Sequence, residues 1–234
     1  MVSVQRLTKR YGDVMAVDDL TFSLEAGTIT GFLGPNGAGK TTTLRLLLGL
    51  AEPTDGEALV LGRRYRELDQ PAQRVGAVLE SNDFDPGRSG GDHLRALAIA
   101  AEIPSSRVDE VLELVELAGT ADRRVKTYSL GIRQRLGLAA ALLGNPGLLI
   151  LDEPANGLDP AGVHWLRSFL RSFADGGRTV LVSSHLLAEV AQAVDGVMII
   201  DRGRLVAAAP LDELTGDGRT LEQVYLGLIA GRTS

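Results

Sequence analysis

Apolar and polar residues alternate through the first part of the chain, with turn-forming residues at Gly12 and Gly27. This alternation predicts strands over residues 2–33, because successive side chains of a strand point to opposite faces. Short apolar runs at 57–61 and 75–79 predict two further strands. The N-terminal third of the chain is therefore expected to be rich in β-structure.

The periodicity changes to that of helices from about Ser89 to Leu143. Apolar residues recur there at intervals of three and four, which predicts helices over 92–101, 105–117 and 130–143. A long helical block thus interrupts the strand-rich sequence.

Alternation of strands and helices returns after Pro146. Strands that alternate with helices form right-handed crossovers and a mostly parallel sheet. The strands are predicted over 148–152, 179–183 and 197–201, and the helices over 160–173 and 185–194.

These patterns divide the chain into three parts. Residues 1–80 and 144–208 are expected to form an α/β core, into which a helical subdomain at 81–143 is inserted. A C-terminal tail at 209–234 follows, with an amphipathic helix predicted over 220–230.

A glycine-rich loop at residues 34–41, GPNGAGKT, joins a predicted buried strand to a predicted helix. It satisfies the pattern G-x-x-x-x-G-K-[ST], in which glycines allow backbone N–H groups to face an anion. The helix N-terminus adds roughly half a positive charge. We expect Lys40 to reach the β- and γ-phosphates of a nucleotide and the Thr41 hydroxyl to hold Mg²⁺. The residues predicted to bind the nucleotide here are Gly34, Pro35, Asn36, Gly37, Ala38, Gly39, Lys40, Thr41 and Thr42.

Two carboxylates, Asp152 and Glu153, end the apolar strand at 148–151. Ligands of open α/β sheets bind beside the carboxyl ends of strands. Asp152 is placed to hold Mg²⁺, directly or through water, and Glu153 to activate the attacking water as a general base. The alternative is a pair of solvated acids at a strand exit, which the phosphate loop in the same chain disfavours.

Charge and hydropathy restrict the classes of function. The chain has 234 residues, 44% of them hydrophobic, a net charge of −6 and no cysteine. The acidic balance argues against a nucleic-acid surface, and the lack of cysteine excludes disulfides and thiolate metal sites. The longest uncharged stretch, 136–151, is shorter than the roughly 20 apolar residues that cross a bilayer. We therefore expect a soluble, cytoplasmic chain whose membrane role comes through a partner.

Three further motifs follow the same order along the chain as in a known family. Residues 128–135 read YSLGIRQR, residues 156–159 read NGLD, and His185 follows a predicted strand. Together with the phosphate loop and the two carboxylates, their order and spacing resemble the ATPase subunits of ABC transporters along nearly the whole chain. The closest likeness is to single-domain ATPases of ABC-2-type bacterial exporters, of the drug and antibiotic-resistance kind.

The resemblance implies a P-loop NTPase of the ABC ATPase fold, with a mostly parallel sheet, N-terminal antiparallel strands and an inserted helical subdomain. It implies that Tyr11 stacks on adenine and that His185 contacts the γ-phosphate and orients the attacking water. Ser129 and Gly131 are expected to face a γ-phosphate held by a second subunit, and Asp159 to lie at the dimer seam. Ser129 also stands at a predicted helix start, where its hydroxyl would cap the helix.

Two positions depart from the family pattern. Glu80 stands where the family usually has glutamine, and its carboxylate can bind Mg²⁺ but adds negative charge beside the triphosphate. Leu130 stands where many members have glycine, so a bulky side chain would narrow the cleft. The predicted catalytic residues are Glu153, His185 and Lys40, and the predicted metal ligands are Thr41, Asp152 and Glu80.

The predicted function is ATP binding and hydrolysis that powers a membrane exporter. Each chain supplies half of each catalytic site, so a homodimer or a pair of ATPase subunits would close head to tail on two ATP molecules with Mg²⁺. The expected partner is an integral membrane permease subunit in a separate chain. The location is then the inner face of the cell membrane, and no nucleic acid is bound.

Two other functions stay open from the sequence. A soluble ABC-type ATPase in translation or DNA maintenance would carry tandem ATPase units, a coiled-coil insert, zinc cysteines or a basic face, whereas this chain has one phosphate loop, no cysteine and an acidic balance. A nucleotide-dependent regulatory module would not need Glu153 and His185.

Overall fold

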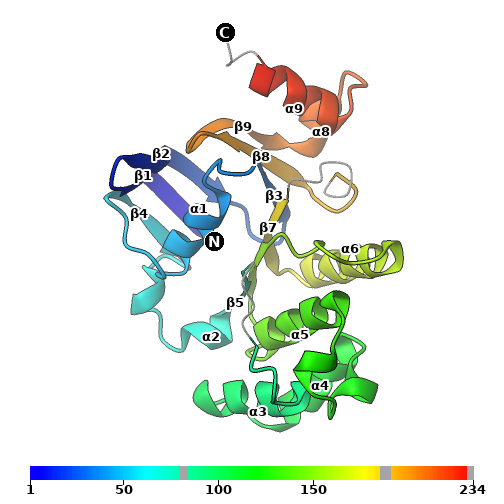
Figure 1. Ribbon diagram of the computed structural model, residues 1–234. Coiled ribbons are helices and arrows are strands. Elements are labelled where there is room, and N and C mark those ends of the chain that lie inside the picture. Colours follow the sequence, from blue (N-terminus) through cyan, green and yellow to red (C-terminus); the bar gives the residue numbers. More distant parts are fainter. Residues whose placement is uncertain (80–83, 185–190, 231–234) are drawn as a thin grey trace.

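The structure is a computed structural model that describes residues 1–79, 84–184 and 191–230. The ribbon forms a β-rich body with helices at both of its ends (Figure 1). Glu80, His185 and most of the helix predicted at 185–194 lie outside the described residues.

A three-stranded antiparallel sheet forms the N-terminal layer, with the strand order β2-β1-β4. Strand β1 (Val2–Tyr11) pairs with β2 (Val14–Leu24) through a short hairpin, and with β4 (Asp55–Val60) on its other edge. Apolar side chains of this sheet, such as Leu7 and Leu20, are fully buried. The antiparallel N-terminal strands expected from the sequence are confirmed.

The main sheet has six strands in the order β5-β6-β7-β3-β8-β9, and its first five are parallel. Their nearly continuous apolar sequences are typical of strands that are covered on both faces. These parallel strands are β3 (Ile29–Leu33), β5 (Val75–Val78), β6 (Leu148–Asp152), β7 (Thr179–Ser184) and β8 (Gly196–Asp201).

The sixth strand, β9 (Arg204–Pro210), pairs antiparallel with β8 at the edge of the sheet. The sequence patterns did not predict it. Its residues are mostly half-exposed and include three alanines in a row, so the alternation of apolar and polar residues is weak. Pairing with the buried strand β8 through a tight turn determines its conformation instead.

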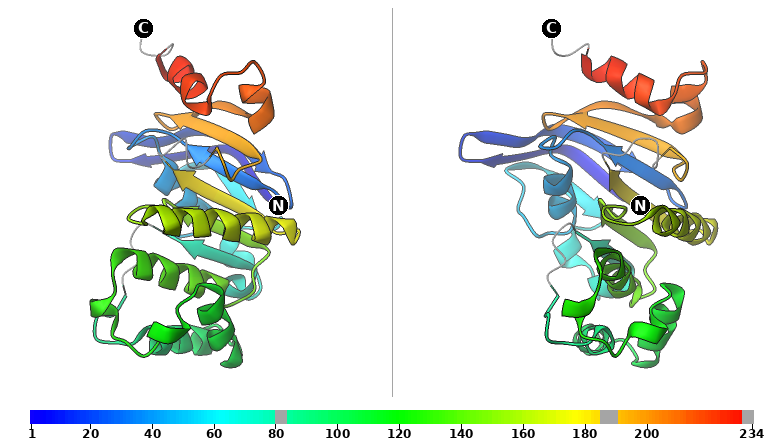
Figure 2. Two further views of the ribbon diagram at one scale, coloured as in Figure 1. Left: turned by 90° about the vertical axis from the view of Figure 1, so that its right-hand side faces the viewer. Right: turned by 45° about the vertical axis from the view of Figure 1, so that its right-hand side comes forward.

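Helices cover both faces of the main sheet. Helix α1 (Lys40–Leu47) and the N-terminal sheet pack on one face, around Phe32, Ile150 and Leu181. Helix α6 (Pro160–Asp175) packs on the other face (Figure 2). The remaining short helices are α2 (Pro71–Arg74) and the 3₁₀ turns Tyr65–Glu67, Ala118–Thr120 and Val125–Thr127.

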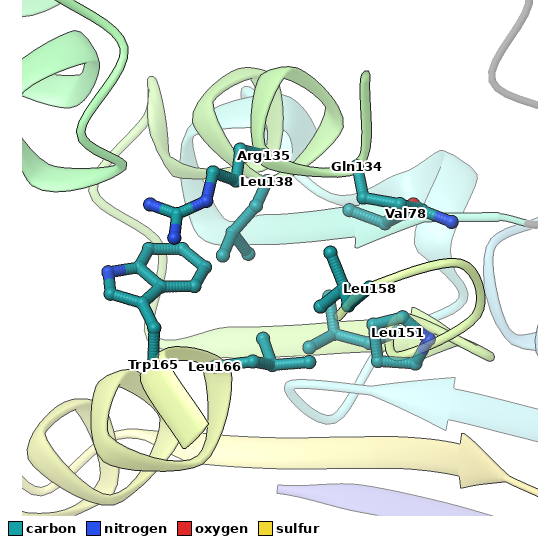
Figure 3. Close-up of a pocket in the computed structure, with 9 residues that line it drawn as sticks. Val78, Gln134, Arg135, Leu138, Leu151, Leu158, Trp165 and Leu166 are labelled. Atoms are coloured by element: carbon teal, nitrogen blue, oxygen red, sulfur yellow. The ribbon is translucent and has the colours of Figure 1, made fainter. Parts of the chain in front are cut away.

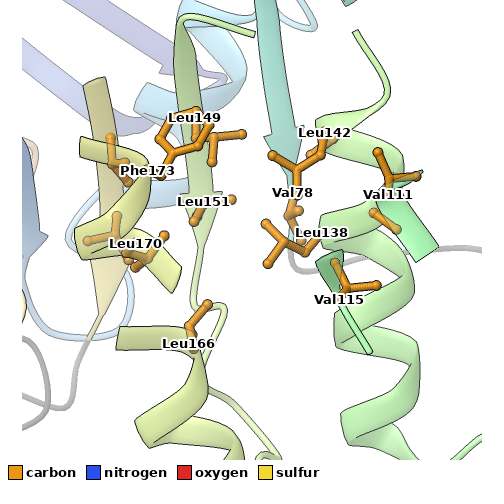
Figure 4. Packing of buried hydrophobic residues seen from close by; sticks show 14 of the residues in the cluster. Val78, Val111, Val115, Leu138, Leu142, Leu149, Leu151, Leu166, Leu170 and Phe173 are labelled. Carbon is orange, nitrogen blue, oxygen red and sulfur yellow. The ribbon is translucent and has the colours of Figure 1, made fainter. Parts of the chain in front are cut away.

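The helical subdomain consists of α3 (Gly90–Ala100), α4 (Ser106–Leu114) and α5 (Leu130–Leu142). All three helices were predicted, with ends that differ by no more than a few residues. Leu138 and Leu142 of α5 lie between the sheet and α4 within one continuous apolar cluster (Figure 4). The subdomain therefore packs on the α/β core through α5.

Two helices, α8 (Leu211–Thr215) and α9 (Leu221–Ala230), follow the main sheet. Leu221 and Val224 of α9 are buried whereas Leu226 is exposed, as expected for the predicted amphipathic helix. In the parts of the chain that the structure describes, no helix combines the length and apolar composition that crossing a bilayer requires.

Candidate active site

The phosphate loop occupies the carboxyl end of β3, a strand whose five residues are all buried. Close backbone contacts require glycine at Gly34 and Gly39. A Cβ atom added at Gly34 would lie 2.5 Å from the carbonyl oxygen of Ile200, and one at Gly39 would lie 2.4 Å from that of Ala16. Gly39 also has a φ of 103°, which residues with a side chain rarely adopt. The loop conformation is therefore fixed by packing on two neighbouring strands.

Lys40, the first residue of α1, is held inside this loop. Its Nζ atom donates a hydrogen bond to the carbonyl oxygen of Gly34 at 2.6 Å and lies 3.5 Å from Oε1 of Glu153. The residue is 6% exposed. A single ammonium group thus faces the loop and the carboxylate together, where it can bind phosphate oxygens.

Thr41 and Asp152 are brought together from α1 and β6, 111 residues apart in the chain. The Thr41 Oγ1 atom donates to Oδ2 of Asp152 at 2.7 Å, and the Ser183 hydroxyl donates to the other carboxylate oxygen. Asp152 is only 2% exposed. A hydroxyl beside a buried carboxylate fits Mg²⁺, which prefers oxygen ligands.

Glu153 lies at a sharp change of direction after β6, with a φ of 49°. Its backbone N–H donates to the Ser183 hydroxyl at 3.0 Å and to the Ser183 carbonyl oxygen at 3.2 Å. These bonds, and the neighbouring Lys40 ammonium, direct the carboxylate towards the phosphate loop. A carboxylate in this position can accept a proton from an attacking water.

These groups open into a cleft of about 510 Å³. Its lining comes from β2, from the phosphate loop and α1, and from the loop after β6. The lining residues are Val14, Met15, Ala16, Pro35, Asn36, Gly37, Gly39, Lys40, Thr41, Thr42, Glu153 and Asn156.

The residues Val14, Met15, Ala16 and Asn156 were not predicted from the sequence. Val14 and Met15 are 65% and 41% exposed, although both are apolar. An apolar pair beside a phosphate-binding loop is suited to a flat base. The sequence signal that could have indicated them is the predicted hairpin, because its turn places the first residues of β2 beside the last residues of β1.

Tyr11 pairs with Val14 across the β1–β2 hairpin and is 49% exposed. Lys9 lies over its ring, with Nζ 4.8 Å from the ring centroid. Tyr11 is therefore the pairing partner of a residue that lines the cleft, but it does not itself belong to the described lining.

Ser129 and Gly131 lie on the helical subdomain, and neither belongs to the described lining of the cleft. The Ser129 hydroxyl accepts a hydrogen bond from the backbone N–H of Ile132 at 3.3 Å and caps α5, as predicted. The Asp159 carboxylate similarly caps α6 by accepting from the N–H of Gly162 at 2.8 Å. Both residues thus stand at exposed or half-exposed helix starts.

Leu130 fills the space between the start of α5 and the loop that precedes α6. A Cβ atom added at Gly157 would lie 2.0 Å from Leu130 Cδ2, so the two residues are in direct contact. Leu130 is nevertheless 56% exposed.

Two polar side chains of α5 join the helical subdomain to the core. The side-chain amide of Gln134 donates to the carbonyl oxygen of Asn156 at 3.3 Å. The Arg135 guanidinium lies over the ring of Trp165 on α6, 4.0 Å from its centroid (Figure 3). It also donates to the carbonyl oxygen of Val115. Glu80 and His185 lie outside the described residues, so their roles stay predictions.

Comparison with known proteins identifies the family. Residues 17–156 match the family model described as ABC transporter. The bacitracin transport ATP-binding protein BcrA of Bacillus licheniformis is 42% identical over 217 residues, which are 92% of this chain and 71% of that protein. The lantibiotic transport ATP-binding protein SrtF of Streptococcus pyogenes is 34% identical over 212 residues, which are 91% of this chain and 92% of that protein.

Solved structures agree with this assignment. The ATP-binding subunit of an ABC transporter superposes with a TM-score of 0.88 at 27% identity, covering 98% of this chain and 99% of that one. A dimeric ATP-binding cassette in a post-hydrolysis state with ADP and Pi shares the fold, with a TM-score of 0.81 at 23% identity over 90% of this chain and 99% of that one. The chain therefore belongs to the ABC transporter family, as an ATP-binding protein that hydrolyses ATP.

Proposed function

We propose that the chain is the ATPase subunit of a membrane exporter and works as a head-to-tail dimer that encloses two ATP molecules. One observation carries this proposal. The cleft gathers Lys40, Thr41 and Glu153, and Thr41 is hydrogen-bonded to the buried Asp152. Ser129 and Gly131 belong instead to an exposed helix start outside its lining. A second copy placed head to tail would bring that helix start to the open side of the cleft.

The chain's own residues divide the work of hydrolysis. The loop amides and Lys40 bind the triphosphate, and Tyr11, Val14 and Met15 take the adenine. Thr41 and Asp152 would hold Mg²⁺, which would supply positive charge to neutralise the phosphates.

Glu153 orients and deprotonates the attacking water. The α5 N-terminus of the second copy stabilises charge on the transferred phosphoryl group with the Ser129 hydroxyl and the Gly131 N–H. The family resemblance alone assigns phosphate contact to His185 and a metal contact to Glu80, since both lie outside the described residues. Hydrolysis then replaces the attraction between the two subunits at the bound nucleotide by charge repulsion, and the dimer opens at the seam near Asp159.

The motion would be passed to an integral membrane permease subunit at the inner face of the membrane. Relatives named for bacitracin and lantibiotic transport support export of antimicrobial peptides or similar compounds. They also disfavour a role in translation, DNA maintenance or purely regulatory binding. The permease would select the exported molecule.

The test is the oligomeric state of the Glu153→Gln variant by analytical ultracentrifugation. We expect it to bind ATP, to dimerise with saturating MgATP and to turn over roughly 10²–10⁴-fold more slowly than the wild type. The control is Glu153→Gln combined with Lys40→Ala, which should stay monomeric. A Glu153→Gln variant that binds ATP yet stays strictly monomeric would refute the dimer, and one with normal turnover would refute the role of Glu153.

A further inference from the structure

The tight turn between β8 and β9 touches two other segments of the chain through its backbone. Arg202 and Gly203 have φ values of 49° and 80°, as in a two-residue hairpin turn. The Gly203 N–H donates to the carbonyl oxygen of Ala38 in the phosphate loop at 2.9 Å. The Gly203 carbonyl oxygen accepts from the N–H of Asp18 in β2, also at 2.9 Å. The turn therefore bridges the phosphate loop and the N-terminal sheet.

Backbone packing at this point is tight. A Cβ atom added at Gly203 would lie 3.0 Å from the Cα of Val17 and 3.1 Å from the carbonyl oxygen of Ala16. A Cβ atom added at Gly39 would meet the same Ala16 oxygen at 2.4 Å and the Cα of Gly203 at 3.6 Å. Three backbone segments, distant in sequence, thus meet at van der Waals distance.

One ion pair closes this contact. The Nε and Nη2 atoms of Arg204 lie 2.8 Å and 2.7 Å from Oδ2 of Asp18. The Arg204 side chain is 56% exposed and that of Asp18 is 28% exposed. Partly exposed pairs add little to stability, so the importance of this one is geometric.

The geometry points to a positioning role in nucleotide binding for the Asp18–Arg204 pair and the Gly203 turn. The β2 segment that holds Asp18 begins with Val14, Met15 and Ala16, which line the cleft beside the phosphate loop. The pair and the turn fix the distance between that wall and the loop. The pair and the turn therefore determine how well the base and sugar of ATP fit against β2 while the phosphate loop binds the triphosphate. Asp18 and Arg204 themselves lie outside the described lining.

This inference rests on the proposed ATP site and gives a specific expectation. ATP uses both walls of the cleft, whereas inorganic tripolyphosphate uses the loop. Breaking the Asp18–Arg204 pair should weaken the binding of ATP and leave the binding of tripolyphosphate unchanged. If the pair only supported the fold, its loss would weaken the binding of both compounds.

The experiment measures Kd for ATP and for tripolyphosphate by calorimetry, together with KM and kcat. For Arg204→Ala and Asp18→Ala we expect Kd and KM for ATP to rise about tenfold, with kcat and the tripolyphosphate Kd unchanged. Arg204→Lys should recover part of the ATP affinity. The matched control is Arg171→Ala, because Arg171 makes a similar pair with Asp195 at 2.9 Å and neither residue lines the cleft.

The outcomes separate this inference from the proposed function. Unchanged ATP affinity, or equal losses for ATP and tripolyphosphate, would overturn the positioning role while leaving the ATPase intact. If the wild-type chain bound neither compound, the proposed site and this inference would both fall.

Discussion

The two helix starts proposed to face one ATP molecule, at Lys40 and at Ser129, are built differently. The start of α1 is surrounded by groups of the same chain, since Lys40 contacts Gly34 and Glu153 and is 6% exposed. The start of α5 is exposed, since Ser129 caps the helix through Ile132 and Leu130 contacts Gly157 but remains largely accessible. One end of the site is therefore organised before a partner arrives, and the other is presented outward.

The two regions also differ in how they are held. The cleft is fixed by backbone contacts and by hydrogen bonds between residues of the parallel strands, such as those of Ser183. Helix α5 is linked to α6 by the stacking of Arg135 on Trp165, in addition to the apolar cluster beneath it. Side-chain contacts of this kind can shift more readily than a close backbone contact. The helical subdomain is thus the part better suited to move.

The largest expected effect comes from mixing two inactive variants. Lys40→Ala removes the phosphate contact of a chain's own cleft, and Ser129→Arg blocks the helix start that it presents to its partner. Each variant should lose at least about 100-fold in ATPase rate. A mixed dimer contains one intact site, so an equimolar mixture should recover to about a quarter of the wild-type rate. The measurement is the steady-state rate against mixing ratio, and a rate equal to the sum of the two separate variants would refute the shared site.

The sequence identified residues that the fold brings together at the organised end of the site, because their signals are local, and their binding roles stay predictions. The loop at 34–41 and the carboxylates after the strand at 148–151 are each contained in a few consecutive residues. Their meeting, at 2.7 Å between Thr41 and Asp152, follows from the parallel strand order.

The features that the sequence did not predict depend on tertiary contacts between residues that are distant in the chain. Arg204 and Asp18 are 186 residues apart, and no local pattern connects them. Strand β9 takes its conformation from β8, and Val14 and Met15 reach the cleft through the β1–β2 hairpin. Exposed apolar residues at a strand start carry no periodic signal, so their role needs the fold.

A smaller effect would separate the two roles of Ser129. Aspartate caps helices as well as serine, so Ser129→Asp should keep the free energy of unfolding within about 0.5 kcal/mol of the wild type. Its carboxylate would repel the γ-phosphate of the partner's ATP, and the ATPase rate should fall about tenfold or more. Thr220→Asp is the matched control, because the Thr220 hydroxyl accepts from the N–H of Gln223 at the start of α9, and it should leave the rate unchanged. If Ser129→Asp kept both its ATPase rate and its stability, Ser129 would only cap α5 and would not contact the γ-phosphate of the partner's ATP.

The smallest effect concerns acid sensitivity of the helical subdomain. His93 on α3 lies edge-on to Phe84, with the ring centroids 5.0 Å apart. Burial, and then the Arg88 guanidinium, lower the pKa of His93 from its ordinary value, against a smaller opposing effect of Asp85. Between the lowered pKa and about 6.5, the unfolded chain binds more protons than the folded chain. The stability contributed by neutral His93 is therefore complete above about pH 6.5 and is lost as the pH falls through the lowered pKa.

Thermal unfolding at pH 7.5 and pH 5.5 measures this contribution. The wild type should lose more stability on acidification than His93→Gln, because glutamine takes up no proton. If His93→Gln lost as much stability as the wild type, acid sensitivity would have to come from other groups. The helical subdomain would then differ from the core in how it is attached, and not in how it responds to pH.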